Sequence, residues 1–399
     1  MGAEKKGSKR KKIVRIVVIA AILVVVILLA AIYGIWHNEL STLASMEKVN
    51  EADEDNLEGN VYWIEVSGGY YFEELLEQGG VSSDTELISF ITENITKGLI
   101  PMSISESELG CSSFTSVTED GDRLFSRNYD MTSTNTGLVI TDPGDGRHAS
   151  VSTVDLQFLG LGTDSDTDSL MSRITMLAAP YVAMDGMNDA GVAVSIHMSY
   201  QGADDDSIPT DQQTDQADMT STMVMRLILD YADSVEEAVE LVSAYDLHES
   251  ANCSFHYMVA DSTGKSAILE WINVDATDST DTDGTKRTLQ VTWCGEEDFQ
   301  VMTNFIIADG YYEEGAEDDM KGLDRYEYIC SALEESDGIV EDEEAALEIL
   351  EAVGRRTWNP DGSIVTVHSV VYNLTDRTAT WVSNEHYGEE AFTYYLSVE

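Results

Sequence analysis

The stretch Gly110–Asp130 constrains the fold more than any other part of this 399-residue chain. Two runs rich in Phe, Thr, Val and Leu flank Asp120-Gly121, a pair that supplies the positive φ needed by a tight two-residue turn, so we predict a β-hairpin. With that turn, the ladder places Cys111 opposite Asp130. A turn longer by one or two residues moves the partner of Cys111 to Tyr129 or to the residue before it.

Every one of these registers gathers a thiol, a guanidinium and a carboxylate at one end of two paired strands: Cys111, Arg127 and Asp130. A thiol is mostly protonated at neutral pH, and a fixed positive charge such as Arg127 favours the nucleophilic thiolate. Asp130 would suit an α-ammonium group if the chain were cut just before Cys111, because the free amine could then act as the base. The simpler interpretation is a buried strand cysteine beside a surface ion pair.

The pattern Gly110–Phe114 followed by Ser126–Asp130 resembles the start of the mature chain in the choloylglycine hydrolase family, also called linear amide C-N hydrolases, which are N-terminal nucleophile hydrolases. The spacing of Cys111, Arg127 and Asp130 matches the family's nucleophile, arginine and aspartate. Further matching pieces follow in the family's order over most of residues 111 to 385: Asp185–Val194, Thr303-Asn304, Asp324–Tyr326 and Ser369–Leu374.

The resemblance implies further members of the site. Asn304 matches the side-chain amide that supports the oxyanion, and Arg325 matches the family's last active-site arginine. Where the family has a second asparagine, this chain has His197 or Met198, depending on a one-residue alignment choice, so a backbone N–H or the His197 ring is left as the second donor. Without the resemblance, Asn304 would be a turn residue and Arg325 an exposed helix charge.

The implied activity is hydrolysis of a linear, non-peptide amide in a small N-acyl substrate, such as a conjugated bile salt, a penicillin or an N-acyl amino acid, with no metal or organic cofactor. Cys111 would need to become a chain terminus, and Gly110-Cys111 resembles a self-cleavage bond that leaves the upstream piece attached. The alternatives are an acyltransferase of the same family, in which another amine intercepts the acyl-enzyme, and a catalytically inactive surface binding protein.

The N-terminus predicts a membrane anchor. Residues 1–15 form a basic tail with seven of the 22 Lys and Arg residues, and the apolar run 16–36 is long enough to cross a bilayer as a helix. That run exceeds the apolar region of a cleaved signal peptide. Because positive residues remain cytoplasmic, we expect a single-pass cell-membrane protein with a cytoplasmic N-terminus and an extracellular catalytic domain.

The remainder divides by composition into an acidic stalk (37–59), a pro-segment that packs on the catalytic domain (60–110) and an N-terminal nucleophile hydrolase domain (111–399). Strand-like runs alternate with paired helices in the last part, which predicts an α+β domain, and the resemblance implies a four-layer αββα sandwich. In the pro-segment, residues 61–66 predict a strand, and residues 70–78 and 83–97 predict helices.

The net charge of −52 excludes a nucleic-acid partner, since such a surface repels phosphates. Three acidic loops, 164–168, 203–218 and 275–284, lack the ligand spacing of an EF-hand and are interpreted as solvated, without a calcium site. Cys253, Cys294 and Cys330 leave one thiol over if two of them pair, so a disulfide and buried thiols are both retained as alternatives. A homo-oligomer is also left open.

Overall fold

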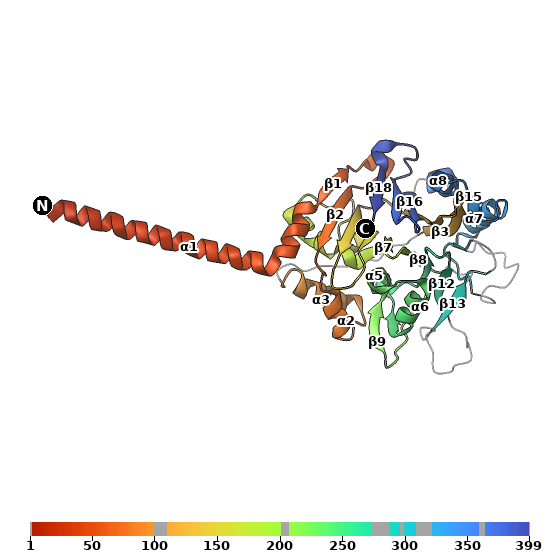
Figure 1. Cartoon of the computed structure of the whole chain (residues 1–399), viewed down its shortest axis with the longest axis horizontal. Coiled ribbons are helices and arrows are strands. Elements are labelled where there is room, and N and C mark those ends of the chain that lie inside the picture. The colour runs from red at the N-terminus through yellow and green to blue at the C-terminus, as the bar shows by residue number, and fades with distance from the viewer. Residues whose placement is uncertain are drawn as a thin grey trace.

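The computed structural model describes residues 2–98, 110–200, 207–272, 287–295, 299–308, 321–358 and 364–398. Within these residues, two large sheets and the helices packed on them form a mixed α+β domain (Figure 1). This agrees with the α+β class expected from the alternation of strand-like and helical runs.

The first sheet has nine strands among the described residues, in the order β1-β2-β5-β6-β7-β8-β11-β12-β13. Only β2 and β5 pair in parallel, and the other neighbours are antiparallel. Strand β2 agrees with the strand predicted over residues 61–66, and β7 overlaps the start of the motif Asp185–Val194. Their bounds are β1 Glu47–Asn50, β2 Val61–Ser67, β5 Thr136–Asp142, β6 Ser150–Asp155, β7 Ala183–Asn188, β8 Val192–Met198, β11 Phe255–Asp261, β12 Ser266–Ile272 and β13 Thr288–Trp293.

The second sheet has seven strands in the described part of the chain, in the order β14-β3-β4-β16-β17-β18, with β15 pairing alongside β3. The hairpin β3–β4 lies inside this sheet, because β14 flanks one strand and β16 the other. The bounds are β3 Gly110–Thr118, β4 Arg123–Met131, β14 Val301–Met302, β15 Ile339–Val340, β16 Val365–Asn373, β17 Thr378–Ser383 and β18 Thr393–Ser397. A small parallel pair, β9 Ala217–Thr220 with β10 Tyr245–His248, stands apart.

The hairpin register differs by one residue from the register expected for a two-residue turn. Cys111 pairs with Tyr129, and Gly110 pairs with Asp130. The loop has three residues, because the N–H of Thr118 donates to the carbonyl of Asp122 at 2.9 Å. Gly121, with φ 95°, is the last loop residue and supplies the left-handed conformation there. The longer-turn alternative, with Tyr129 as the partner, is therefore correct.

Helices pack on each large sheet. Helix α5 (Ser221–Tyr231) contacts β7 and β8 of the nine-stranded sheet, and α8 (Glu343–Ala352) contacts β4 and β16 of the seven-stranded sheet. Helix α6 (Val235–Ser243) begins after Ser234, whose hydroxyl accepts from the N–H of Glu237 at 3.3 Å. The remaining helices are α1 Gly2–Ser45, α2 Phe72–Glu77, α3 Asp84–Asn94, α4 Leu170–Thr175, α7 Leu323–Glu334 and α9 Arg355–Trp358.

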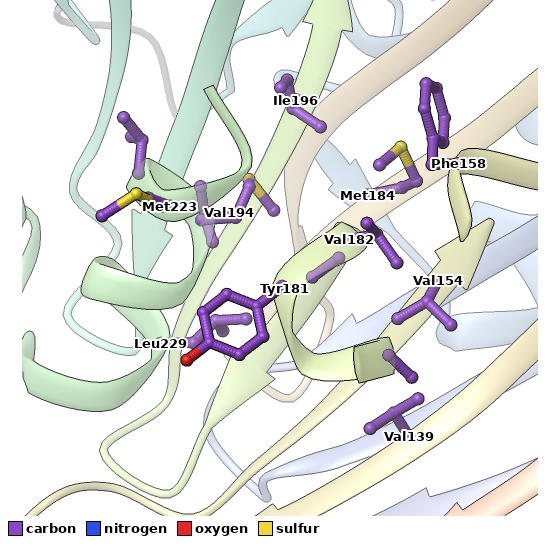
Figure 2. Packing of buried hydrophobic residues seen from close by; sticks show 14 of the residues in the cluster. Val139, Val154, Phe158, Tyr181, Val182, Met184, Val194, Ile196, Met223 and Leu229 are labelled. Atoms are coloured by element: carbon purple, nitrogen blue, oxygen red, sulfur yellow. The ribbon is translucent and has the colours of Figure 1, made fainter. Parts of the chain in front are cut away.

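The hydrophobic core divides into separate clusters. The largest combines one face of the nine-stranded sheet with α2, α3, α5 and α6, and Figure 2 shows part of it around Tyr181, Val194 and Leu229. A second cluster contains residues of both sheets, among them Met187 of β7 and Trp381 of β17. A third joins the seven-stranded sheet to α7 and α8. The site described below lies where the two sheets meet, since β3 contacts β8.

Helix α1 projects away from the folded part of the chain (Figure 1). Among the described residues it is the one helix long and apolar enough to cross a membrane, and its position also fits a signal sequence. Its backbone departs from helical geometry at Trp36, where the apolar run ends.

The prediction that residues 37–59 form an acidic stalk is wrong in part. Residues 37–45 continue α1, which packs on β2, and Glu47–Asn50 form an edge strand of the nine-stranded sheet. The polar composition suggested a free segment, but pairing with β2 gives these residues backbone partners that the local sequence does not reveal.

The described part of segment 60–110 packs into the same core as the residues that follow it. Its strand β2 pairs with β5, and Phe72, Leu75, Leu87 and Ile91 belong to the largest cluster. The buried Tyr70 hydroxyl lies 2.5 and 2.6 Å from the two carboxylate oxygens of Asp230. This segment is therefore an integral part of the fold in the uncut chain.

We expect Tyr70→Phe to lower the free energy of unfolding by about 1–3 kcal/mol, because Asp230 is buried and would lose a hydrogen-bond donor. Denaturant unfolding of the full chain measures this. Tyr395→Phe is the matched control, since that ring is 74% exposed, and it should leave the unfolding free energy unchanged. Equal values for the two variants would show that the Tyr70 contact does not join the segment to the domain.

Candidate active site

Cys111 lies fully buried at the start of β3, and its register decides its neighbours. Because Cys111 pairs with Tyr129, Arg127 two residues earlier lies on the same face of the ladder. The Arg127 guanidinium donates to Sγ of Cys111, with Nη2 at 3.3 Å. Asp130 instead pairs at the level of Gly110 and lies beside the backbone that precedes the thiol.

Arg127 is itself fully buried and is held by the other sheet. It donates to the carbonyls of Met184 in β7 and Ile196 in β8, the latter at 2.8 Å. Its Nη1 lies 3.4 Å from a carboxylate oxygen of Asp185. The guanidinium thus connects the nucleophile's strand pair to the nine-stranded sheet.

Asp185 has further partners that fix its charge. His368 Nε2 lies 2.8 Å from one carboxylate oxygen, and the Tyr372 hydroxyl donates to the other at 2.6 Å. Burial alone would raise the pKa of Asp185, but the charges of His368 and Arg127 and these hydrogen bonds lower it to about 2. The carboxylate therefore stays ionised beside Arg127.

The thiol of Cys111 is protonated at neutral pH in the uncut chain. Burial raises the pKa of Cys111 above its ordinary value, and the neighbouring Arg127 charge offsets only part of this effect. Arg127 acts in the direction expected from the sequence, by favouring the thiolate, but it does not outweigh desolvation.

Asn304 and Arg325 both contact the main chain of Cys111. The side-chain oxygen of Asn304 accepts from the N–H of Cys111 at 2.9 Å, and Nη1 of Arg325 donates to the Cys111 carbonyl at 2.6 Å. Arg325 also donates to the side-chain oxygen of Asn304 at 3.0 Å. Arg325 is buried, unlike an exposed helix charge, and Gly322 leaves it room, because a Cβ there would lie 2.7 Å from its Nη2.

His197 and Met198 lie next to this group but offer no side-chain amide. The His197 ring lies 2.9 Å from the Thr303 carbonyl through Nδ1 and 2.8 Å from the Ser113 hydroxyl through Nε2. Burial, followed by the Arg127 and His256 charges, lowers the pKa of His197 well below its ordinary value, so the ring is neutral. Met198 contributes its carbonyl, which accepts from the amide nitrogen of Asn304 at 2.8 Å.

Residues 111–275 match the family model of linear amide C-N hydrolases, choloylglycine hydrolase family. This part of the chain belongs to that family. The family acts on carbon–nitrogen bonds of linear amides, and the chain is a hydrolase of this kind. The family resemblance noted in the sequence is thereby confirmed.

Solved structures similar to this chain include three hydrolases. A mutant of the conjugated bile acid hydrolase from Clostridium perfringens is 14% identical, with 72% of this chain and 92% of that chain covered and a TM-score of 0.47. Penicillin V acylase from Agrobacterium tumefaciens is 17% identical, with 72% and 86% covered and a TM-score of 0.47. The N-acylethanolamine-hydrolyzing acid amidase ortholog of Caenorhabditis elegans is 16% identical, with 66% and 93% covered and a TM-score of 0.38. No curated protein matches the chain.

The structure of this linear amide hydrolase brings Cys111, Arg127, Asp130, Asn304 and Arg325 into one site. Sequence reasoning did not assign a role to Asp185 or His368. A signal was available for Asp185, because an acid inside an apolar strand needs a buried cation, and Arg127 was the candidate.

A small apolar cavity of about 20 Å³ lies behind the arginine. Met184 and Ile196, whose carbonyls accept from Arg127, line it together with Phe158 and Val182, and Figure 2 shows these four side chains in one region of the core. In this uncut chain the cavity has room for no more than a single water-sized group.

All four cysteines are thiols in the structure, so no disulfide joins any two of them there. Of the three acidic loops, the one at residues 275–284 lies outside the described residues, and the loop that ends at Asp218 is considered below.

We expect alkylation of Cys111 in the full chain to have a pH midpoint above the ordinary thiol pKa, because burial disfavours the thiolate. Arg127→Gln should move the midpoint further up by removing the adjacent charge, and Arg127→Lys should move it less. Iodoacetamide labelling of the Cys111 peptide, quantified by mass spectrometry at several pH values, measures this. An unchanged midpoint in Arg127→Gln would contradict the electrostatic role of Arg127.

Proposed function

We propose that this hydrolase is a membrane-anchored extracellular enzyme that cleaves the amide bond of a small N-acyl substrate after its own chain has been cut between Gly110 and Cys111. The observation that carries the proposal is the state of Asp130. Its Oδ2 is buried and accepts no hydrogen bond from the residues that the structure describes. That oxygen lies 3.6 Å from the position a Cβ of Gly110 would take.

A carboxylate oxygen without a hydrogen bond is costly inside a protein. Arg325 and Arg355 face this oxygen only at 3.4 and 3.9 Å, while Oδ1 of Asp130 accepts from the Thr366 hydroxyl at 2.7 Å. An α-ammonium group on Cys111 would supply the missing donor. The uncut chain thus holds a partner for an amine that exists only after the Gly110-Cys111 bond is broken.

Self-cleavage needs the Cys111 thiol and the Gly110 carbonyl, which adjoin at the junction, together with one water molecule. Sγ of Cys111 attacks the Gly110 carbonyl carbon, the Gly110-Cys111 C–N bond breaks with a proton passing to the new amine, and water hydrolyses the thioester. In the mature enzyme the same sulfur attacks the substrate carbonyl while the amine accepts the thiol proton and passes it to the leaving amine. Water then releases the acyl group from the sulfur.

Each remaining residue has a defined part in this scheme. Arg127 favours the thiolate, Asp130 holds the amine, and Asn304 supports the oxyanion through its amide nitrogen. Arg325 orients Asn304 and the backbone of Cys111. Both nitrogens of the neutral His197 ring already contact other groups, the Thr303 carbonyl and the Ser113 hydroxyl. This favours a backbone N–H as the second donor to the oxyanion.

The architecture supports retention of residues 1–110 after the cut. Strand β2 pairs along its length with β5, and Tyr70 contacts Asp230 inside the core. We therefore propose that the first piece stays bound and that α1 anchors the enzyme through residues 16–36. The three core clusters fit a four-layer αββα sandwich, with helices outside two facing sheets.

The proposed substrates are N-acyl amides such as a conjugated bile salt, a penicillin or an N-acyl amino acid. These substrates carry a carboxylate or sulfonate, and the acidic surface of the chain repels anions at long range, so their binding would need local arginines.

The cut is tested on residues 38–399 expressed beside Cys111→Ala and Cys111→Ser variants. We expect intact mass and N-terminal sequencing to show a chain that begins at Cys111 in the wild type, an uncut Cys111→Ala chain, and slow or absent cutting of Cys111→Ser. The two wild-type pieces should elute together in size-exclusion chromatography. An uncut wild type would refute self-cleavage.

We expect Asn304→Ala to lower kcat by about 10²- to 10³-fold with little change in KM, because its amide acts on charge that develops in the transition state. The assay measures amine release from the three substrate types and is normalised to the fraction of chains cut at Cys111. Asn94→Ala, outside the site, should retain wild-type kcat. An unchanged kcat in Asn304→Ala would remove this residue from the oxyanion assignment.

A further inference from the structure

A second group of polar side chains lies on the small parallel pair β9–β10, away from the nucleophile. Asp218 of β9 pairs directly with Asp246 of β10, and His248 is two residues further along β10, on the same face as Asp246. One ligand atom from each of these residues lies within 4.8 Å of the others. Two carboxylates and an imidazole so placed form a donor set for a divalent cation.

The side chain of Asp246 gives a second, independent indication that this group binds a ligand. Its side chain is 1% exposed, and its Oδ2 accepts from the N–H of Thr214. Its Oδ1 is buried and receives no hydrogen bond from any residue in the described ranges. That atom faces into the group, 3.7 Å from Nε2 of His248. A buried carboxylate oxygen left in this way needs a cation.

The distances between the ligand atoms match the ligand spacing around a small metal ion. Nε2 of His248 lies 3.1 Å from Oδ1 of Asp218 and 3.7 Å from Oδ1 of Asp246. Ligands at about 2.1 Å around a tetrahedral ion are about 3.4 Å apart, midway between these values. The other ring nitrogen of His248 lies 2.7 Å from Oδ1 of Asp211. An outer carboxylate in that position orients a metal-binding imidazole.

The backbone beneath the group is fixed by the segment 60–110. The N–H of Asp218 donates to the Gly79 carbonyl at 3.0 Å, and Gly80 forms a parallel bridge with Asp218. Gly80 is required for this approach, because a Cβ there would overlap the Asp218 carbonyl oxygen. An ion at this position would therefore stabilise the contact between the upstream segment and the catalytic domain.

We propose that Asp218, Asp246 and His248 bind one divalent first-row transition-metal cation, with Asp211 positioning the imidazole, as a structural site at the boundary with segment 60–110. This proposal differs from the interpretation of the loop ending at Asp218 as solvated. Mixed imidazole and carboxylate ligands favour manganese or zinc over calcium, which takes oxygen ligands. The ion would bind Nε2 of His248 in place of a proton.

The probe is Mn²⁺, because thiols compete for it less than for Zn²⁺. The full chain is stripped with a chelator and titrated with MnCl₂ at 150 mM salt with excess MgCl₂, and free Mn²⁺ is followed by electron paramagnetic resonance. We expect one bound equivalent and a higher unfolding temperature with Mn²⁺. Asp218→Asn and Asp246→Asn should each weaken binding at least tenfold and abolish the thermal shift.

Asp189→Asn is the matched control, because Asp189 also contacts a histidine, His148, but lies outside the group. It should bind Mn²⁺ as the wild type does. Asp218 is 40% exposed in its side chain, so its substitution tests the site without the folding risk of the buried Asp246. The proposal would be overturned if the wild type showed no saturable Mn²⁺ binding, or if Asp218→Asn bound Mn²⁺ with wild-type affinity. His248 would then be a histidine that is only ion-paired with its neighbouring carboxylates.

Discussion

The buried guanidinium of Arg127 is the constraint on which the active site depends. Removing a charge from water costs several kcal/mol unless partners surround it. Here the partners come from the other sheet: the carbonyls of Met184 and Ile196 and the carboxylate of Asp185. The two sheets must therefore meet at this point, and the sulfur of Cys111 is placed 3.3 Å from the same guanidinium as a result. The contacts that join the two sheets thus also fix the position of the Cys111 thiol beside Arg127.

The local sequence predicted the hairpin but did not determine which residues pair across it. A positive-φ glycine after an acidic residue fits both a two-residue and a three-residue loop. The difference is decided by the Thr118–Asp122 hydrogen bond and by the flanking strands β14 and β16, which are far away in sequence. The shift by one residue matters chemically, because side chains alternate along a strand. It places Tyr129 across from Cys111 and directs Asp130 toward Gly110 instead of toward the sulfur.

The predicted hairpin alone brought Cys111, Arg127 and Asp130 together, but the distant members of the site could be predicted only where they matched a family pattern. Asn304 and Arg325 were found in that way, and the structure brings both to the backbone of Cys111. Asp185 and His368 were missed as a pair because their contact joins β7 of one sheet to β16 of the other, 183 residues apart. The edge strand Glu47–Asn50 was missed for a related reason. Three of its four residues are polar, and pairing with β2 is what makes them a strand.

The structure already assembles most of the geometry that the proposed reaction needs. Strand β3 begins at Gly110, and its ladder with β4 runs from there to the turn. Cys111 would therefore keep the same neighbours if the chain began at Cys111. Asn304 and Arg325 bind the N–H and the carbonyl of Cys111, atoms that the proposed cut leaves in place. What the uncut chain lacks is a base beside a thiol whose pKa burial has raised. The proposed new amine, held by Asp130, would supply that base for substrate hydrolysis without moving a strand.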